Sequence, residues 1–77
     1  MLTNDFLEKL QVAIELEDSQ LTLETDLTQL DVYDSMAKLS VITLVDESFG
    51  KTLPDEDLRK VTTVKSLMEL IGLEKFN

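Results

Sequence analysis

The chain has 77 residues, with 16 acidic and 7 basic side chains, no histidine, no cysteine and a net charge of −9. This length predicts one small domain over residues 1–77, and the missing cysteines exclude disulfides and thiolate zinc sites. The acidic balance excludes nucleic acid and anionic membranes as partners, because both need a basic surface. Without a signal sequence, a membrane-spanning run or a long heptad seam, we expect a cytoplasmic monomer.

The negative charge is concentrated in the first half of the chain. Residues 1–34 hold nine acids and one base, whereas residues 35–77 hold seven acids and six bases. Acidic surfaces attract basic patches on other proteins. We therefore expect the first half to dominate the electrostatic attraction of partners.

The first periodic segment covers residues 4–15. Its apolar residues have the i, i+3, i+4, i+7 spacing of one helix face. They are Phe6, Leu7, Leu10, Ala13 and Ile14. Thr3 or Asn4 can cap this helix, and Asp5 suits the positive end of its dipole.

From residue 16 to residue 34 the periodicity fades, and polar residues are interspersed with leucines. A connection this long in a small domain is usually functional or disordered. Leu21, Leu23, Leu27 and Leu30 argue against disorder, because a solvated linker has no reason to contain them. We expect an ordered loop whose leucines attach it to a helical core.

Residues 35–49 form the clearest predicted helix. Its apolar residues are Met36, Leu39, Ile42, Val45 and Phe49 in one continuous stripe, widened by Val41 and Leu44. Asp34 or Ser35 is expected to cap the helix. Gly50 is expected to end it in the left-handed region.

Two further helices are predicted in the last third of the chain. Residues 54–60 indicate a short helix of at most two turns, with Pro54 in its first turn. Thr62 or Thr63 caps a last helix, which Gly72 ends. The apolar face of that helix contains Val64, Leu67, Met68 and Ile71. With no competing strand pattern, the fold class is all-α: a small four-helix bundle of three longer helices and one short one, with a long loop between the first two.

We expect no catalytic residue and no metal site. The serines lack a histidine as general base, although a serine–lysine pair stays open on sequence alone. The chain is also too small for a walled catalytic cavity. Asp26, Asp31 and Asp34 do not fit a calcium loop, which would need glycine at position 31 and glutamate in place of Ala37.

The most informative motif is Asp34-Ser35-Met36 at the start of the helix over residues 35–49. The accompanying residues are Asp26-Leu27-Thr28-Gln29-Leu30 upstream, and Phe49, Leu53-Pro54-Asp55 and Thr63-Val64 downstream. With this spacing, in an acidic chain of this length, residues 21–71 resemble the acyl carrier protein family.

The resemblance implies that Ser35 receives a 4′-phosphopantetheine arm from coenzyme A through a separate phosphopantetheinyl transferase. The thiol of the arm would then carry an acyl or aminoacyl group as a thioester in a biosynthetic pathway, such as fatty acid, lipid or specialised metabolite synthesis. The other implied partners are loading ligases or synthases and acyltransferases with basic docking patches. Asp34 is the flanking acid, and Met36 belongs in part to the contact surface. Because Asp-Ser-Met also occurs in D-alanyl and aminoacyl carriers, the cargo stays open.

Two departures from the family pattern lead to a hypothesis about docking. Asp31-Val32-Tyr33 stands where fatty-acid carriers usually have a glycine, and the helix after Ser35 has acids only at Asp46 and Glu47. We therefore hypothesise a dedicated carrier in which the loop acids do more of the docking than the helix acids. The loop acids are Glu24, Asp26 and Asp31.

The alternative assigns Ser35 no role in modification. Serine is a common N-cap residue, so Ser35 can be a helix cap in an acidic helical adaptor that is never modified. On that hypothesis Ser35→Ala would lose only a cap, which is about 0.5–2 kcal/mol of stability.

Overall fold

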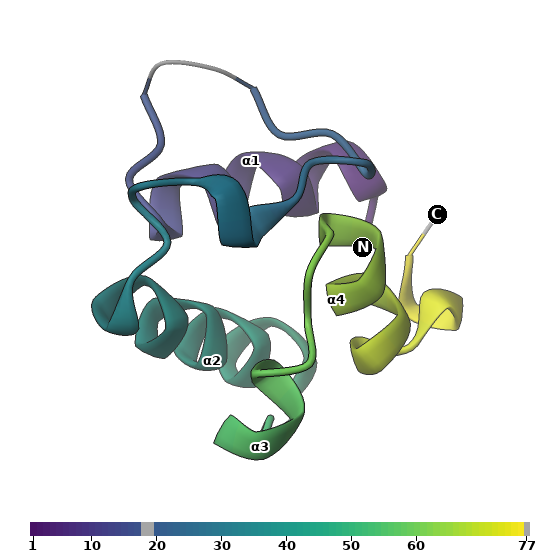
Figure 1. Ribbon diagram of the computed structural model, residues 1–77. Helices are drawn as coiled ribbons and strands as arrows, with labels where there is room; N and C mark the ends of the chain where they lie inside the picture. Colours follow the sequence, from purple (N-terminus) through teal and green to yellow (C-terminus); the bar gives the residue numbers. More distant parts are fainter. Residues whose placement is uncertain (18–19, 77) are drawn as a thin grey trace.

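The computed structural model describes residues 1–17 and 20–76, which form helices joined by loops (Figure 1). The helices are α1 (Thr3–Ala13), α2 (Ser35–Phe49), α3 (Asp55–Leu58) and α4 (Val64–Ile71), with 3₁₀ segments η1 (Leu27–Gln29) and η2 (Leu73–Lys75). Strands are absent from the described residues, apart from one isolated bridge between Asp26 and Thr63. The predicted all-α bundle is confirmed. Nor does the described chain contain a helix long and apolar enough to cross a membrane.

Helix α1 differs from its prediction at both ends. Leu2 is the N-cap and makes no side-chain capping hydrogen bond, so the predicted caps are wrong. The helix stops at Ala13, because Glu15 has a positive φ of 58°. The N–H of Leu16 then donates to the carbonyl of Gln11 at 3.0 Å, and the N–H of Glu15 donates to Val12 at 3.1 Å. This is a Schellman motif, which satisfies the last carbonyls of the helix and closes it early.

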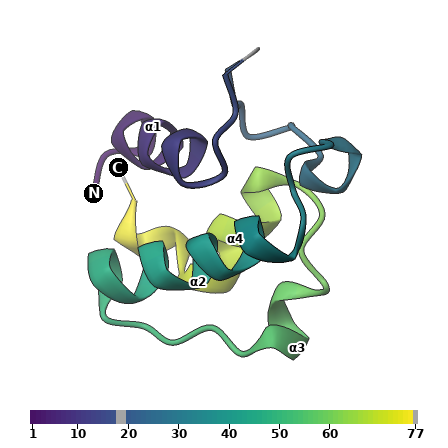
Figure 2. The same ribbon diagram turned by 90° about the vertical axis from the view of Figure 1, so that its left-hand side faces the viewer.

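The loop between α1 and α2 is ordered, as predicted, over its described residues. Leu27 is fully buried, and backbone hydrogen bonds attach the loop to the start of α4. The N–H groups of Val64 and Lys65 donate to the carbonyls of Thr25 and Leu23, both at 3.0 Å. These N–H groups have no acceptor inside the helix, so the loop carbonyls supply the hydrogen-bond acceptors that the first turn of α4 lacks. Figures 1 and 2 both show η1 beside the start of α4.

Helix α2 has its predicted bounds, but only part of its predicted apolar stripe is buried. The buried residues are Ala37, Val41 and Val45, which follow an i, i+4 row, whereas Met36 is 73% and Leu39 59% exposed. The predicted stripe is therefore wrong at these two positions. Because apolar residues surround α2 on most sides, their periodicity does not by itself select the face that packs against the core.

The short helix and the last helix begin and end close to the predicted residues. Pro54 is the N-cap of α3, one position before the predicted first turn. The hydroxyl of Thr63 accepts a hydrogen bond from the N–H of Ser66 at 3.1 Å, so the cap of α4 is Thr63, one of the two predicted candidates. Gly72 ends α4 with a φ of 121°. The predicted apolar face of α4 is buried throughout.

Three aromatic rings close the core at the end opposite Ser35. Phe6 of α1 lies 6.0 Å from Phe49 of α2 and 5.0 Å from Phe76, and the last two rings are 5.2 Å apart, between centroids. The tilted and edge-to-face angles are the arrangements that aromatic pairs prefer. This cluster joins both ends of the chain to the C-terminal end of α2 and anchors that end of the helix.

Candidate site around Ser35

Two adjacent residues at the start of α2, Asp34 and Ser35, have different roles. The Asp34 carboxylate accepts a hydrogen bond from the N–H of Ala37 at 3.0 Å, and the Asp34 carbonyl accepts one from Lys38 at 3.0 Å. Asp34 is thus the N-cap and Ser35 the first helical residue. Ser35 is exposed, and within residues 1–17 and 20–76 its hydroxyl has no hydrogen-bond partner. The interpretation of Ser35 as the cap of α2 is therefore wrong.

The backbone at this helix start can bind an anion. Among the described residues, the N–H groups of Ser35 and Met36 have no hydrogen-bond acceptor, whereas those of Ala37 and Lys38 are bonded to Asp34. Free N–H groups and the positive end of the helix dipole favour a phosphate oxygen beside them. A phosphodiester on the Ser35 hydroxyl fits this arrangement chemically.

One aromatic residue and one base lie beside the helix start. The ammonium nitrogen of Lys38 is 5.7 Å from the centroid of the Tyr33 ring, within the range of a cation–π contact. The Tyr33 hydroxyl is buried and has no hydrogen-bond partner among the described residues. Burial raises the pKa of Tyr33 above its ordinary value, because it disfavours the phenolate. Sequence reasoning did not identify this pair.

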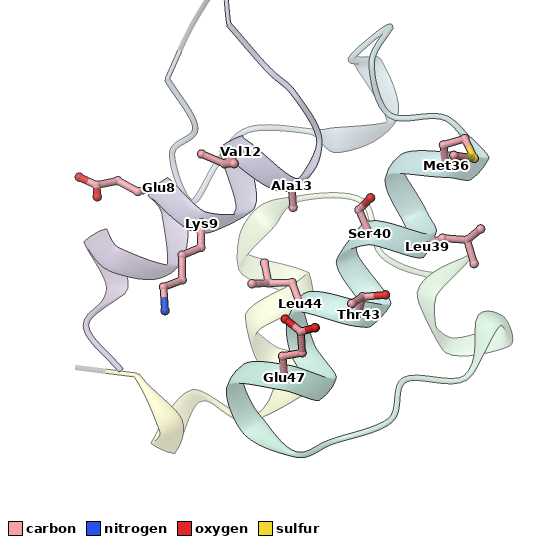
Figure 3. Close-up of a pocket in the computed structure, with 10 residues that line it drawn as sticks. All are labelled: Glu8, Lys9, Val12, Ala13, Met36, Leu39, Ser40, Thr43, Leu44 and Glu47. Atoms are coloured by element: carbon pink, nitrogen blue, oxygen red, sulfur yellow. The ribbon is translucent and has the colours of Figure 1, made fainter.

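An open groove of about 630 Å³ runs between α1 and α2 from Met36 (Figure 3). Its apolar lining includes Val12 of α1 and Met36, Leu39 and Leu44 of α2. Leu44 points toward α1, and Met36 lies at the far end of the groove, next in sequence to Ser35. Val12, which is 77% exposed, was missed because it lies outside the predicted apolar face of α1.

A smaller hollow of about 400 Å³ adjoins this groove at the start of α2. The two share Ala13, Met36 and Ser40, and Asp34 lines the smaller hollow. The two residues that flank Ser35 therefore line adjoining hollows. Ser35 itself lines neither hollow, so a chain attached to its hydroxyl would reach them past Met36 or Asp34.

The predicted docking acids fall into two groups. Glu24 and Asp26 lie in the part of the loop that is attached to α4, whereas Asp31 lies in the segment that leads into α2. Glu24 and Asp31 are exposed. Asp26 has a structural role, because its carboxylate accepts hydrogen bonds from the N–H of Thr28 at 2.9 Å and from the Thr28 hydroxyl. Within the described chain, no group of three or more acidic side chains could hold a metal ion.

Comparisons with protein-family models, curated proteins and solved structures find no match for this chain. The site around Ser35 is therefore interpreted from its own geometry. That geometry consists of an exposed hydroxyl, two N–H groups without an acceptor among the described residues, and an apolar groove lined by the next residue, Met36.

Proposed function

We propose that this protein is an acyl carrier protein, which holds its cargo as a thioester on a 4′-phosphopantetheine arm attached to Ser35. The proposal rests on the observation that Asp34, and not Ser35, caps α2. Asp34 already provides the cap, so the exposed Ser35 hydroxyl has no role in stability that would explain it. A hydroxyl without a partner on an accessible surface suits modification by another enzyme.

The chemistry of modification fits this environment. The Ser35 oxygen bonds to the phosphorus that holds pantetheine, the bond from that phosphorus to the adenosine bisphosphate half of coenzyme A breaks, and the hydroxyl proton passes to a base of the transferase. The free N–H groups of Ser35 and Met36 favour the resulting anion. The bound arm supplies the thiol that this chain, which has no cysteine, lacks.

The groove between α1 and α2 favours an acyl cargo over an aminoacyl one. An apolar chain can cover Val12, Met36 and Leu39, which are otherwise among the exposed large apolar residues. An amino acid needs no such surface. We expect an acylated arm to raise the melting temperature relative to the bare arm, and an equal melting temperature would favour the aminoacyl carrier.

The docking hypothesis can be tested without disturbing the fold. We expect Glu24→Gln with Asp31→Asn to raise the KM of a partner enzyme more than Asp46→Asn with Glu47→Gln. Each pair removes two exposed negative charges. Asp26 is left unchanged, because its carboxylate caps η1. Equal effects of the two pairs would contradict docking through the loop.

The decisive experiment is the intact mass of the protein after incubation with coenzyme A and a broad-specificity phosphopantetheinyl transferase. We expect one phosphopantetheine addition in the wild type and in the control Ser48→Ala, and none in Ser35→Ala. Because Asp34 remains as cap, Ser35→Ala should stay folded, which circular dichroism would check. No addition to the folded wild type, with the transferase active on another substrate, would favour the unmodified adaptor.

A further inference from the structure

Lys38 is an isolated base in a long acidic stretch. Residues 10–50 contain nine acids and no base except Lys38. On α2 it lies three residues after Ser35, and residues three apart on a helix are neighbours on its surface. The one positive side chain of this stretch is thus next to the proposed attachment residue.

The conformation of Lys38 directs its charge toward the start of the helix. Its ammonium nitrogen lies 5.7 Å from the ring centroid of Tyr33, so the side chain extends toward the segment that precedes α2. This is the direction in which helical side chains lean. Asp34 is four residues before Lys38, yet the ion pair found among the described residues is Arg59–Asp55. The ammonium group therefore faces a ring and not a carboxylate.

We propose that Lys38 binds the phosphodiester of the arm on Ser35 and positions the first atoms of that arm over the start of α2. This inference rests on the proposed function. The phosphodiester adds one negative charge beside Asp34, in a chain whose net charge is already −9. Lys38 offsets that repulsion, and a cation–π contact with the Tyr33 ring is weak enough to be exchanged for a phosphate.

Thermal unfolding of matched variants tests the ion pair. The change in melting temperature on modification is measured for the wild type, Lys38→Gln, Lys38→Arg and the control Lys60→Gln, whose side chain is exposed. At low salt we expect this change to be less favourable in Lys38→Gln by about 1–8 °C, the shift that a surface ion pair produces in a domain of this size. Lys38→Arg and Lys60→Gln should behave as the wild type, and high salt should remove the difference.

A nuclear magnetic resonance measurement reports the contact directly. Tyr33 is the one tyrosine of the chain, so its ring signals are unambiguous. We expect these signals to shift on modification of the wild type, because the ammonium group moves from the ring to the phosphate, and to stay unchanged in Lys38→Gln. Coenzyme A added to Ser35→Ala should not move them. A shift as large as that on modification would assign Lys38 to the free coenzyme and overturn the inference.

The intact mass shows whether the arm is attached, and this distinguishes a failure of the proposed function from a failure of the inference about Lys38. If the folded wild type acquires no arm, the proposed function and this inference both fall. If the arm is present but all variants show the same change in melting temperature, Lys38 does not bind the phosphodiester, while the proposed function stands.

Discussion

The two ends of α2 differ sharply in how they are held. At the C-terminal end, Phe49 packs against two other aromatic rings, and Gly50 closes the helix with a φ of 64°. At the N-terminal end, Ser35 is exposed, and Met36 and Leu39 are 73% and 59% exposed. One helix thus has an end that contributes to the core and an end that presents side chains to other molecules.

This difference between the two ends of α2 indicates that the C-terminal end serves stability and that the N-terminal end is available for binding. Exposed apolar side chains that line a groove contribute little to the folded core and are typical of binding surfaces. The aromatic end holds the helix, so the Ser35 end can carry residues chosen for accessibility. Substitutions at the two ends should therefore have effects of very different size.

The largest effect is expected from Phe6→Ala. Phe6 is fully buried and contacts both other rings of the cluster, so its loss should lower the free energy of unfolding by about 3–5 kcal/mol. That is a large fraction of the stability of a small domain, so the urea midpoint of this variant should fall sharply. Leu39→Ala is the control and should change stability by no more than about 0.5 kcal/mol. Urea unfolding measures both, and similar losses would contradict the comparison of the two ends.

The next largest loss of stability is expected from Asp34→Ala, and it should exceed that of Ser35→Ala. Asp34→Ala removes the cap of α2 and should lower the free energy of unfolding by about 0.5–2 kcal/mol. Asp34→Asn keeps a capping oxygen and should be nearly neutral. Ser35→Ala should change stability by less than about 0.5 kcal/mol. A larger loss in Ser35→Ala than in Asp34→Ala would restore Ser35 as the cap.

Lys51 provides a third test, away from the site. Its ammonium group donates to the carbonyls of Leu70 and Ile71 at 3.0 and 3.1 Å, where α4 leaves acceptors without helical partners. Lys51→Met should lower the free energy of unfolding by about 1 kcal/mol, because it removes a cation from a helix C-terminus. Lys60→Met, at an exposed position, should have no measurable effect. Equal urea midpoints for the two variants would show that the contact does not stabilise the fold.

The smallest effect is expected at Tyr33. Tyr33→Phe removes a buried hydroxyl without a partner among the described residues, and should raise stability by up to about 1 kcal/mol. Burial raises the pKa of Tyr33, so the unfolded chain releases this proton at a lower pH than the folded one. The stability of the wild type should therefore fall as the pH rises above about 10, relative to Tyr33→Phe. Tyrosinate absorbance in the native and denatured states checks the order of the two titrations, and coincident curves would contradict it.

The sequence by itself determined the features that depend on local backbone chemistry. The bounds of α2, the cap at Thr63 and the stop at Gly72 follow from side chains within one turn of the helix ends. The apolar face of α4 also follows from its spacing, because its buried residues occupy one side only. These elements could be predicted without knowing what surrounds them.

The tertiary structure decided the features that depend on contacts between distant residues. It selected the buried row of α2 among several apolar sides, and it brought Lys51 to carbonyls 19 and 20 residues away. The cap of α2 is a local hydrogen bond, but the sequence left it open between Asp34 and Ser35, and only the structure shows it at Asp34. Periodicity describes one helix, whereas the choice of a face requires the neighbours that exclude water from it. The exposure of Met36 and Leu39 beside Ser35 is therefore a result of packing, which buried the row of Ala37, Val41 and Val45 instead.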